Sequence, residues 1–172
     1  MIQRKQAIMF SLLGLVIVSA VVVLYWLPDK NRLSLDDLNH NLDVADIKFG
    51  MLEEEVIELW GAGQYLHGFG GHGRDYKEQG VQISFPGDAD NDLYGRVGGL
   101  ELVSADHSVY AIRVGDEQEA AAKQLLSYGF VESDFSEDIF VQGEFMIALH
   151  GSPVIEFIQV WFDDKDLKDR NY

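Results

Sequence analysis

Three aspartates at alternate positions are the residues whose spacing most suggests chemistry. Asp88, Asp90 and Asp92 lie in the stretch PGDADNDLYG. Calcium prefers several carboxylate oxygens from one tight turn, and D-x-D-x-D opens the calcium loop of an EF-hand. The pattern then departs from that loop, because Leu93 stands where it has glycine and Gly99 where it has glutamate. Two interpretations stay open: a nonstandard calcium site, or a solvated turn rich in Asp and Asn.

A glycine-rich run, HGFGGHGRDY at residues 67–76, is the second candidate for chemistry. Gly68, Gly70 and Gly73 fall at the G-x-G-x-x-G spacing that cradles the pyrophosphate of a dinucleotide. Such a loop must follow a strand and open a helix, so that the helix N-terminus faces the phosphates. Here the run follows a predicted helix and precedes a strand expected to begin near Tyr76. We therefore expect no nucleotide cofactor and interpret the run as a flexible connection in which glycine tolerates positive φ.

Residues for metal-dependent or hydrolytic catalysis form no recognised pattern. His67 and His72 could hold a metal with Asp75, but their spacing fits no strong zinc pattern, so we interpret them as exposed loop histidines. The chain has no cysteine, which excludes disulfides, zinc–thiolate sites and cysteine nucleophiles. It also lacks G-x-S-x-G, H-E-x-x-H and a P-loop. Carboxylate pairs are plentiful, so a hydrolase with unrecognised carboxylates stays an alternative.

Three aromatic residues are candidates for binding a partner. In the strand-like stretch EFIQVWF, alternation places Phe157 and Trp161 on the face opposite the other apolar residues. A sheet buried on one side only would expose them, although helices could instead cover that face. Tyr94 lies in the aspartate-rich loop, where binding residues often reside because a loop can change without disturbing the core. We therefore predict protein binding by Tyr94, Phe157 and Trp161.

An internal repeat must position these residues. The stretch IKFG at 47–50 recurs as IRVG at 112–115, and each copy opens a helix with an acidic start. Each helix is followed by an alternating apolar strand, VQISF or EFMIALH, and then by a closing strand, GGLELVSAD or EFIQVWFDD. The sequence therefore predicts an α+β fold. It consists of a duplicated module of one helix and two or three antiparallel strands, at residues 46–111 and 112–166, with a tail at 167–172.

An uncharged segment at residues 7–27 predicts a transmembrane helix before this module. As a helix it would span about 31 Å, which matches a bilayer core. Arg4 and Lys5 favour an N-terminus inside, so residues 1–6 would be a short cytoplasmic tail. We expect a single-pass protein of the cell membrane with an extracytoplasmic C-terminal domain. The alternative is a cleavable signal peptide, since VSA at 18–20 resembles a cleavage site.

Residues 28–45 are interpreted as a tether between the membrane helix and the repeat. They are polar, but Ser34 followed three positions later by Asp37 is typical of a helix start. Leu35, Leu38 and Leu42 follow at helical spacing, so we expect a short helix on this tether.

The charge balance limits the classes of partner. The chain has 29 acidic and 13 basic residues, a formal net charge of −16. Nucleic acid and anionic lipid headgroups are poor partners for such a chain, because both repel negative charge.

The Ile-x-x-Gly turn, the acidic-started helix ending in glycine and the following strand pair resemble the modules of the β-lactamase-inhibitor-protein-like group. That group includes the small lipoprotein of the outer-membrane barrel-assembly machine. The resemblance covers roughly residues 47–164, as two modules in tandem. It implies a noncatalytic function in the cell envelope, carried out by protein–protein contact.

The combined expectation is a membrane-anchored, extracytoplasmic protein-binding module that is not an enzyme. Its partner would be another envelope or secreted protein, with no cofactor required. The alternatives are a calcium-binding envelope module, using Asp88, Asp90 and Asp92, and the hydrolase.

Overall fold

A broad antiparallel sheet dominates the protein. The computed structural model describes residues 33–68 and 70–163. Within them, eight strands pair in the order β2-β3-β4-β5-β10-β9-β8-β7, and β1 pairs with β6 in a separate ribbon. The helices are α2 (Leu35–His40), α3 (Glu53–Trp60) and α4 (Gln118–Ser127). The strands are β1 (Leu42–Asp43), β2 (Gln64–Gly68), β3 (Gly71–Tyr76), β4 (Val81–Pro86), β5 (Gly99–Leu102), β6 (Ser108–Val109), β7 (Val131–Ser133), β8 (Ser136–Gln142), β9 (Phe145–His150) and β10 (Phe157–Phe162).

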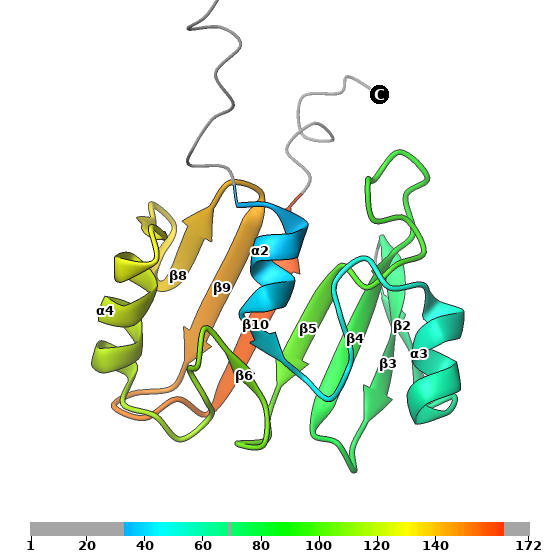
Figure 1. The fold of residues 1–172 in the computed structure, drawn as a ribbon, viewed down its shortest axis with the longest axis horizontal. Helices are drawn as coiled ribbons and strands as arrows, with labels where there is room; N and C mark the ends of the chain where they lie inside the picture. The colour runs from blue at the N-terminus through cyan, green and yellow to red at the C-terminus, as the bar shows by residue number, and fades with distance from the viewer. Residues whose placement is uncertain (1–32, 69, 164–172) are drawn as a thin grey trace, which may run out of the picture. The chain divides into compact units, whose positions relative to one another are not determined.

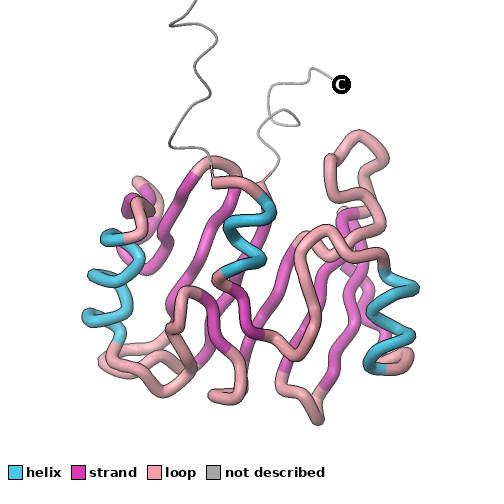
Figure 2. The backbone as a smooth tube through the Cα atoms, in the orientation of Figure 1, coloured by secondary structure: helices cyan, strands magenta, loops and turns pink. Residues whose placement is uncertain are grey.

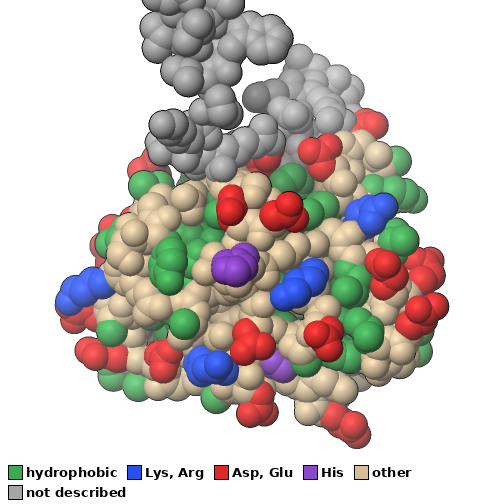
Figure 3. Space-filling model, viewed as in Figure 1, with side chains coloured by type: hydrophobic (Ala, Val, Ile, Leu, Met, Phe, Trp, Pro, Cys, Tyr) green, Lys and Arg blue, Asp and Glu red, His purple; other side chains and the backbone are tan. Residues whose placement is uncertain are grey.

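The core lies on one face of this sheet, together with the helices. In Figures 1 and 2, helix α2 and the β1–β6 ribbon run in front of the sheet. Leu38 of α2, Val56 of α3 and Leu125 of α4 are completely buried in one cluster with alternate strand residues such as Ile83 and Ile147. Figure 3 shows many acidic and few basic side chains on this helix side. We call the opposite side of the sheet the open face.

The two halves of the sheet repeat the same backbone contacts. In each half a short turn precedes the helix, and the glycine that ends this turn bonds to the segment before the closing strand. The paired bonds are Ile47 N–H to Val44 O (2.9 Å) with Ile112 N–H to Val109 O (2.9 Å), and Gly50 N–H to Val97 O (2.9 Å) with Gly115 N–H to Ile155 O (2.8 Å). Each half also has the same order of elements, one helix followed by four strands: α3 with β2 to β5, and α4 with β7 to β10.

Strands β5 and β10 join the halves. Leu100 opposes Val160 and Leu102 opposes Ile158, with Glu101 opposite Gln159 between them. Because directly opposed residues share a face, the apolar pairs enter the core and the polar pair points to the open face.

The expected α+β class with an N-terminal transmembrane helix is wrong. The described residues are mostly β-sheet, because the two sets of strands merge across β5 and β10 into one sheet. The helices stay short, at 6, 8 and 10 residues. Gly61, with φ +81°, ends α3, and Gly129, with φ +95°, follows the end of α4.

The transmembrane segment itself falls outside the part of the chain that is described. Residues 7–27 and the tails at 1–6 and 167–172 are not among the described residues. Among residues 33–68 and 70–163, no helix is long and apolar enough to cross a membrane. We do not retain the single-pass membrane interpretation.

The short helix predicted from Ser34 and Asp37 forms as α2, but it does not lie on a tether. The Asp37 N–H donates to Ser34 Oγ (3.1 Å), and the Ser34 N–H donates back to the Asp37 carboxylate (3.4 Å). Leu38 and, beyond the helix, Leu42 and Val44 are buried. This segment is therefore part of the core.

The glycine-rich run at 67–76 is not a flexible connection. Its residues belong mostly to the β2–β3 hairpin, in which His67 opposes His72 and Gly68 opposes Gly71. Glycine is depleted in strands, which is why the sequence pattern indicated a loop. The tertiary structure requires it, because a Cβ on Gly73 would lie 2.9 Å from the Ile83 carbonyl oxygen of β4.

Candidate functional site

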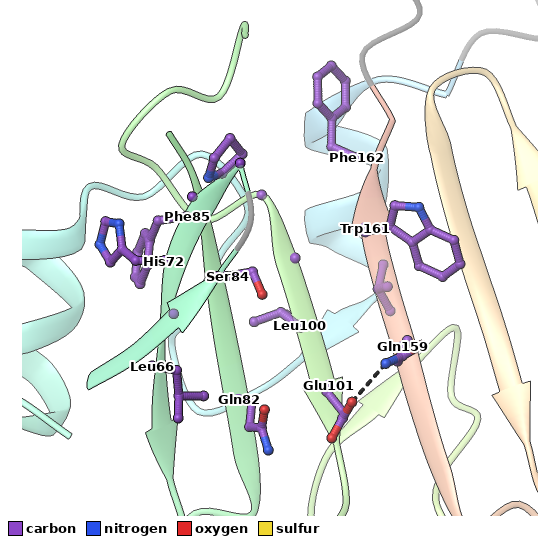
Figure 4. A pocket seen from close by; sticks show the side chains of 18 of the residues that line it. Leu66, His72, Gln82, Ser84, Phe85, Leu100, Glu101, Gln159, Trp161 and Phe162 are labelled. Atoms are coloured by element: carbon purple, nitrogen blue, oxygen red, sulfur yellow. Dashed lines mark hydrogen bonds between the residues drawn. The ribbon is translucent and has the colours of Figure 1, made fainter. Parts of the chain in front are cut away.

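A groove of about 540 Å³ crosses the open face. It is lined by residues of β2, β3, β4, β5 and β10, and Figure 4 views it with its lining side chains. This volume lies in the range of about 300–1,000 Å³ that binding sites for small ligands usually have. The floor consists of residues with small side chains or none: Gly71, Gly73, Ser84, Gly98 and Gly99.

The small residues of the floor face one another across the strands. Gly73 opposes Ser84, and Ser84 opposes Gly99. A Cβ on Gly99 would lie 3.3 Å from the Ser84 Cβ, so the floor has no space for a further side chain without adjustment. Along the row of Gly73, Ser84 and Gly99, the bottom of the groove is mostly backbone. Larger side chains form its sides.

A row of polar side chains crosses the groove beside this floor. Glu101 directly opposes Gln82 on β4 and Gln159 on β10. The Gln159 Nε2 donates a 2.8 Å hydrogen bond to the Glu101 carboxylate, drawn as a dashed line in Figure 4. Asp75 continues the row on β3, because it opposes Gln82. The row therefore carries two carboxylates and two amides.

His150 holds the Gln159 amide from the other side. Its Nε2 lies 3.0 Å from Gln159 Oε1, and since an amide oxygen only accepts, the ring nitrogen is the donor. The imidazole also stacks on Phe157 with ring centroids 4.2 Å apart. Glu101, Gln159 and His150 thus form a chain of hydrogen bonds whose members are already oriented.

Trp161 borders the groove on the β10 side. It directly opposes Gly99 on β5 and Met146 on β9, and its side chain is partly exposed. Gly99 leaves the β5 side of Trp161 without a side chain, and Figure 4 shows the indole turned toward β9 at the edge of the groove. Figure 4 shows Trp161 and Gln159 on the same strand, with Glu101 on the neighbouring one.

Two of the three binding residues predicted from the sequence lie on the open face. Trp161 lines the groove, and Phe157 lies on the same face, where it packs on His150. Tyr94 is 54 % exposed in the loop between β4 and β5. Pro86 at the end of β4 and Gly98 at the end of the loop line the groove, but no contact places Tyr94 beside Trp161.

The predicted calcium ligands form a loop with its own hydrogen bonds. The Asp90 N–H donates to Asp88 Oδ1 (3.0 Å), and the Leu93 N–H donates to Asn91 Oδ1 (2.8 Å). Leu93 is buried and ties the loop to the core. Within the described ranges, no group of three or more His, Cys, Asp or Glu residues is arranged to hold a metal ion. Calcium binding by Asp88, Asp90 and Asp92 stays a prediction.

A second charged cluster lies at helix α3, on the core side of the sheet. Glu53 accepts a hydrogen bond from Arg74 Nε (2.7 Å) and lies 2.9 Å from His72 Nε2. Burial raises the pKa of this carboxyl, but the hydrogen bonds and charges of His72 and Arg74 outweigh burial and lower it. Asp75 points to the opposite face by strand alternation, so it does not join the two histidines. The sequence suggested exposed loop histidines, but His67 and His72 are paired residues of β2 and β3, with His67 exposed and His72 partly buried.

Sequence reasoning missed the polar row and the glycine floor. One signal was present, because Glu101 alternates with Leu100 and Leu102, and Gln159 alternates with Ile158 and Val160. Alternation alone places both side chains opposite the core. Their meeting, however, depends on the pairing of β5 with β10.

Comparison with known proteins finds a similar fold but identifies no family. No model of a known protein family and no curated protein sequence matches this chain. A similar solved structure is the crystal structure of an extracellular protein containing a SCP domain from Bacillus anthracis str. Ames, with a TM-score of 0.51 and 11% sequence identity. The match covers 83% of this chain and 51% of that protein, so the chain spans about half its length. At this identity the likeness concerns the fold alone.

Proposed function

We propose that this chain is a noncatalytic protein-binding module that works outside the cytoplasm and holds its partner on the open face. The observation that carries the proposal is the sheet's one-sided core. The buried helix residues Leu38, Val56 and Leu125 all pack on one face, while partly exposed Phe157 and Trp161 lie on the other. Partly exposed aromatic side chains are enriched at protein interfaces, where they dominate the binding energy.

The composition of the groove favours binding over hydrolysis. Hydrolysis of a glycosidic bond usually needs a general acid and a second carboxylate on either side of the bond to be broken. Glu101 is the one carboxylate among the residues that line the groove, because Asp75, the other carboxylate of the polar row, lies outside this lining. The hydrogen bond that Glu101 accepts comes from an amide. We therefore propose a docking role for this face.

Two further observations support this proposal. The tandem resemblance to β-lactamase-inhibitor-protein-like modules implies work by protein–protein contact. The protein from Bacillus anthracis that shares the fold is described as extracellular, which supports a location outside the cytoplasm.

Site-directed crosslinking in the cells that make the protein tests the docking face. The chain has no cysteine, so single cysteines can carry a photoreactive maleimide without background. Ser84→Cys places the label on the groove floor, and Glu58→Cys places it on exposed helix α3. We expect a discrete protein adduct from Ser84→Cys that is lost when Trp161→Ala is added, and none from Glu58→Cys.

Equal adducts from both positions, or an adduct that Trp161→Ala leaves unchanged, would overturn the proposal. A circular dichroism spectrum of each labelled chain checks that folding is retained.

A further inference from the structure

We propose that the groove takes a positively charged side chain, arginine in preference to lysine, from an extended segment of the partner. The guanidinium would lie between the Glu101 carboxylate and the Trp161 indole. This inference rests on the proposed function, since it assumes that the open face is the docking face, and it names the chemistry that this face selects.

Charge is the first argument. Strand alternation and register place the carboxylates of Glu101 and Asp75 on the open face. At the described strand positions that share this face, the same registers place no Lys or Arg. A carboxylate has about four lone-pair sites, and among described residues Glu101 receives one hydrogen bond, from Gln159. The remaining acceptor sites face the groove without a cation, so a cationic partner group is complementary.

The relative position of Glu101 and Trp161 is the second argument. Glu101 opposes Gln159, and Trp161, two residues further along β10, opposes Gly99. Glu101 and Trp161 are therefore diagonal neighbours on one face, a relation in which side chains lie about 7–8 Å apart. Figure 4 shows the indole turned toward β9, while Gly99 leaves the β5 side of Trp161 without a side chain. We expect the indole to rotate toward Gly99 on binding, a side-chain change that is common at interfaces, so that a flat cation contacts the carboxylate and the indole together.

The chemistry of these two groups distinguishes arginine from lysine. The guanidinium binds a carboxylate through two parallel hydrogen bonds and stacks on an aromatic face at the same time. Trp is the strongest aromatic partner for such stacking. An ammonium group is a more strongly hydrated point charge and offers no flat surface. The groove therefore favours arginine.

The polar part of the site is already ordered before a ligand arrives. Gln159 is fixed by Glu101 at 2.8 Å and by His150 at 3.0 Å, and His150 is fixed by its stacking on Phe157. Groups that are oriented in advance lose less entropy on binding. The glycine floor of Gly73 and Gly99 leaves backbone surface against which an extended segment can lie.

A titration of the full chain with defined peptides tests the inference. The probes are short, acetylated and amidated Gly/Ser peptides with a central arginine, lysine or citrulline, which has the shape of arginine without its charge. NMR follows the indole N–H of Trp161, assigned by its loss in Trp161→Phe. We expect the arginine peptide to shift this signal, with lysine weaker and citrulline on the order of tenfold weaker.

Two variants that each remove one carboxylate distinguish a local effect of Glu101 from the effect of the protein's overall negative charge. Glu101→Gln keeps the side-chain shape and should weaken arginine binding on the order of tenfold. Glu58→Gln removes the same charge from exposed helix α3 and should change it less than about twofold, because distant charges are screened. The inference is overturned if citrulline binds as well as arginine, or if the two variants weaken binding equally.

The outcomes also separate this inference from the proposed function. A partner that crosslinks to Ser84→Cys without any arginine preference would retain the docking face and refute the charged subsite. A Glu101-dependent arginine preference without a crosslinked partner would retain the subsite and refute the docking function. If a neutral trisaccharide shifts the Trp161 signal and the arginine peptide does not, the groove binds glycans and the inference fails.

Discussion

Replacing Leu38 by alanine tests whether helix α2 is part of the packed domain. The side chain is completely buried against the sheet. Burying a leucine contributes about 1.5–3 kcal/mol, and the cavity left by truncation raises the loss to about 3 kcal/mol or more. Helix propensity does not offset this loss, because leucine and alanine are both good helix formers. A helix of 6 residues has almost no stability of its own, so weaker packing loosens the whole segment.

Urea unfolding of the full chain, followed by circular dichroism and tryptophan fluorescence, measures this loss. We expect a lower midpoint for Leu38→Ala and a melting temperature lower by about 10 °C. Leu59→Ala is the matched control, since Leu59 lies on α3 but is 51 % exposed, and it should cost less than about 1 kcal/mol. If Leu38→Ala costs no more than Leu59→Ala, then α2 is the loose tether that the sequence suggested.

Three further predictions address the charged cluster, the repeat and the groove. Since the folded-state pKa of Glu53 lies below its ordinary value of 4.5, the ionised carboxylate stabilises the fold above that value, and this is lost as pH falls through the folded-state pKa. The stability difference between the parent and Glu53→Gln should therefore shrink in urea melts between pH 7 and pH 3, and a constant difference would contradict the ion pair. Gly115→Ala adds a Cβ with no atom within 4 Å at φ +96°, so it should cost about 1–2 kcal/mol through backbone strain alone. A thermal melt equal to the parent's would refute that strain. Gly99→Ala adds a methyl group to the groove floor with a tight 3.3 Å contact to Ser84. It should lower arginine-peptide affinity several-fold while melting within a few degrees of the parent, and unchanged affinity would show that the groove is not used.

Several local elements could be predicted from the sequence because their signals are local. The alternation in VQISF and EFMIALH indicates strands, and these residues lie in β4 and, except for Glu144, in β9. The pair of Ser34 and Asp37 indicates a helix start, and it forms the cap of α2. Each of these signals depends on neighbours only a few residues apart, which the chain order alone brings together.

The fold class and the glycine hairpin could not be predicted in this way. The glycines of β3 look like loop residues by propensity, but Gly71 and Gly73 are needed where the β4 backbone approaches closely. The merging of the strands into one sheet depends on Leu100 meeting Val160 across β5 and β10. No local pattern specifies a pairing between residues so far apart in the chain.

The candidate site likewise has one part that local sequence patterns predict and one part that depends on strand pairing. Alternation within the EFIQVWF stretch placed Phe157 and Trp161 on the face opposite the other apolar residues, because the period of a strand is a local property. It left open whether helices cover that face. The polar row was decided by the register of β4, β5 and β10, which places Glu101 between Gln82 and Gln159. The sequence by itself thus determined which residues share a face of their strand. Only the tertiary structure decided which of them meet, because hydrogen bonding between distant strands sets that register.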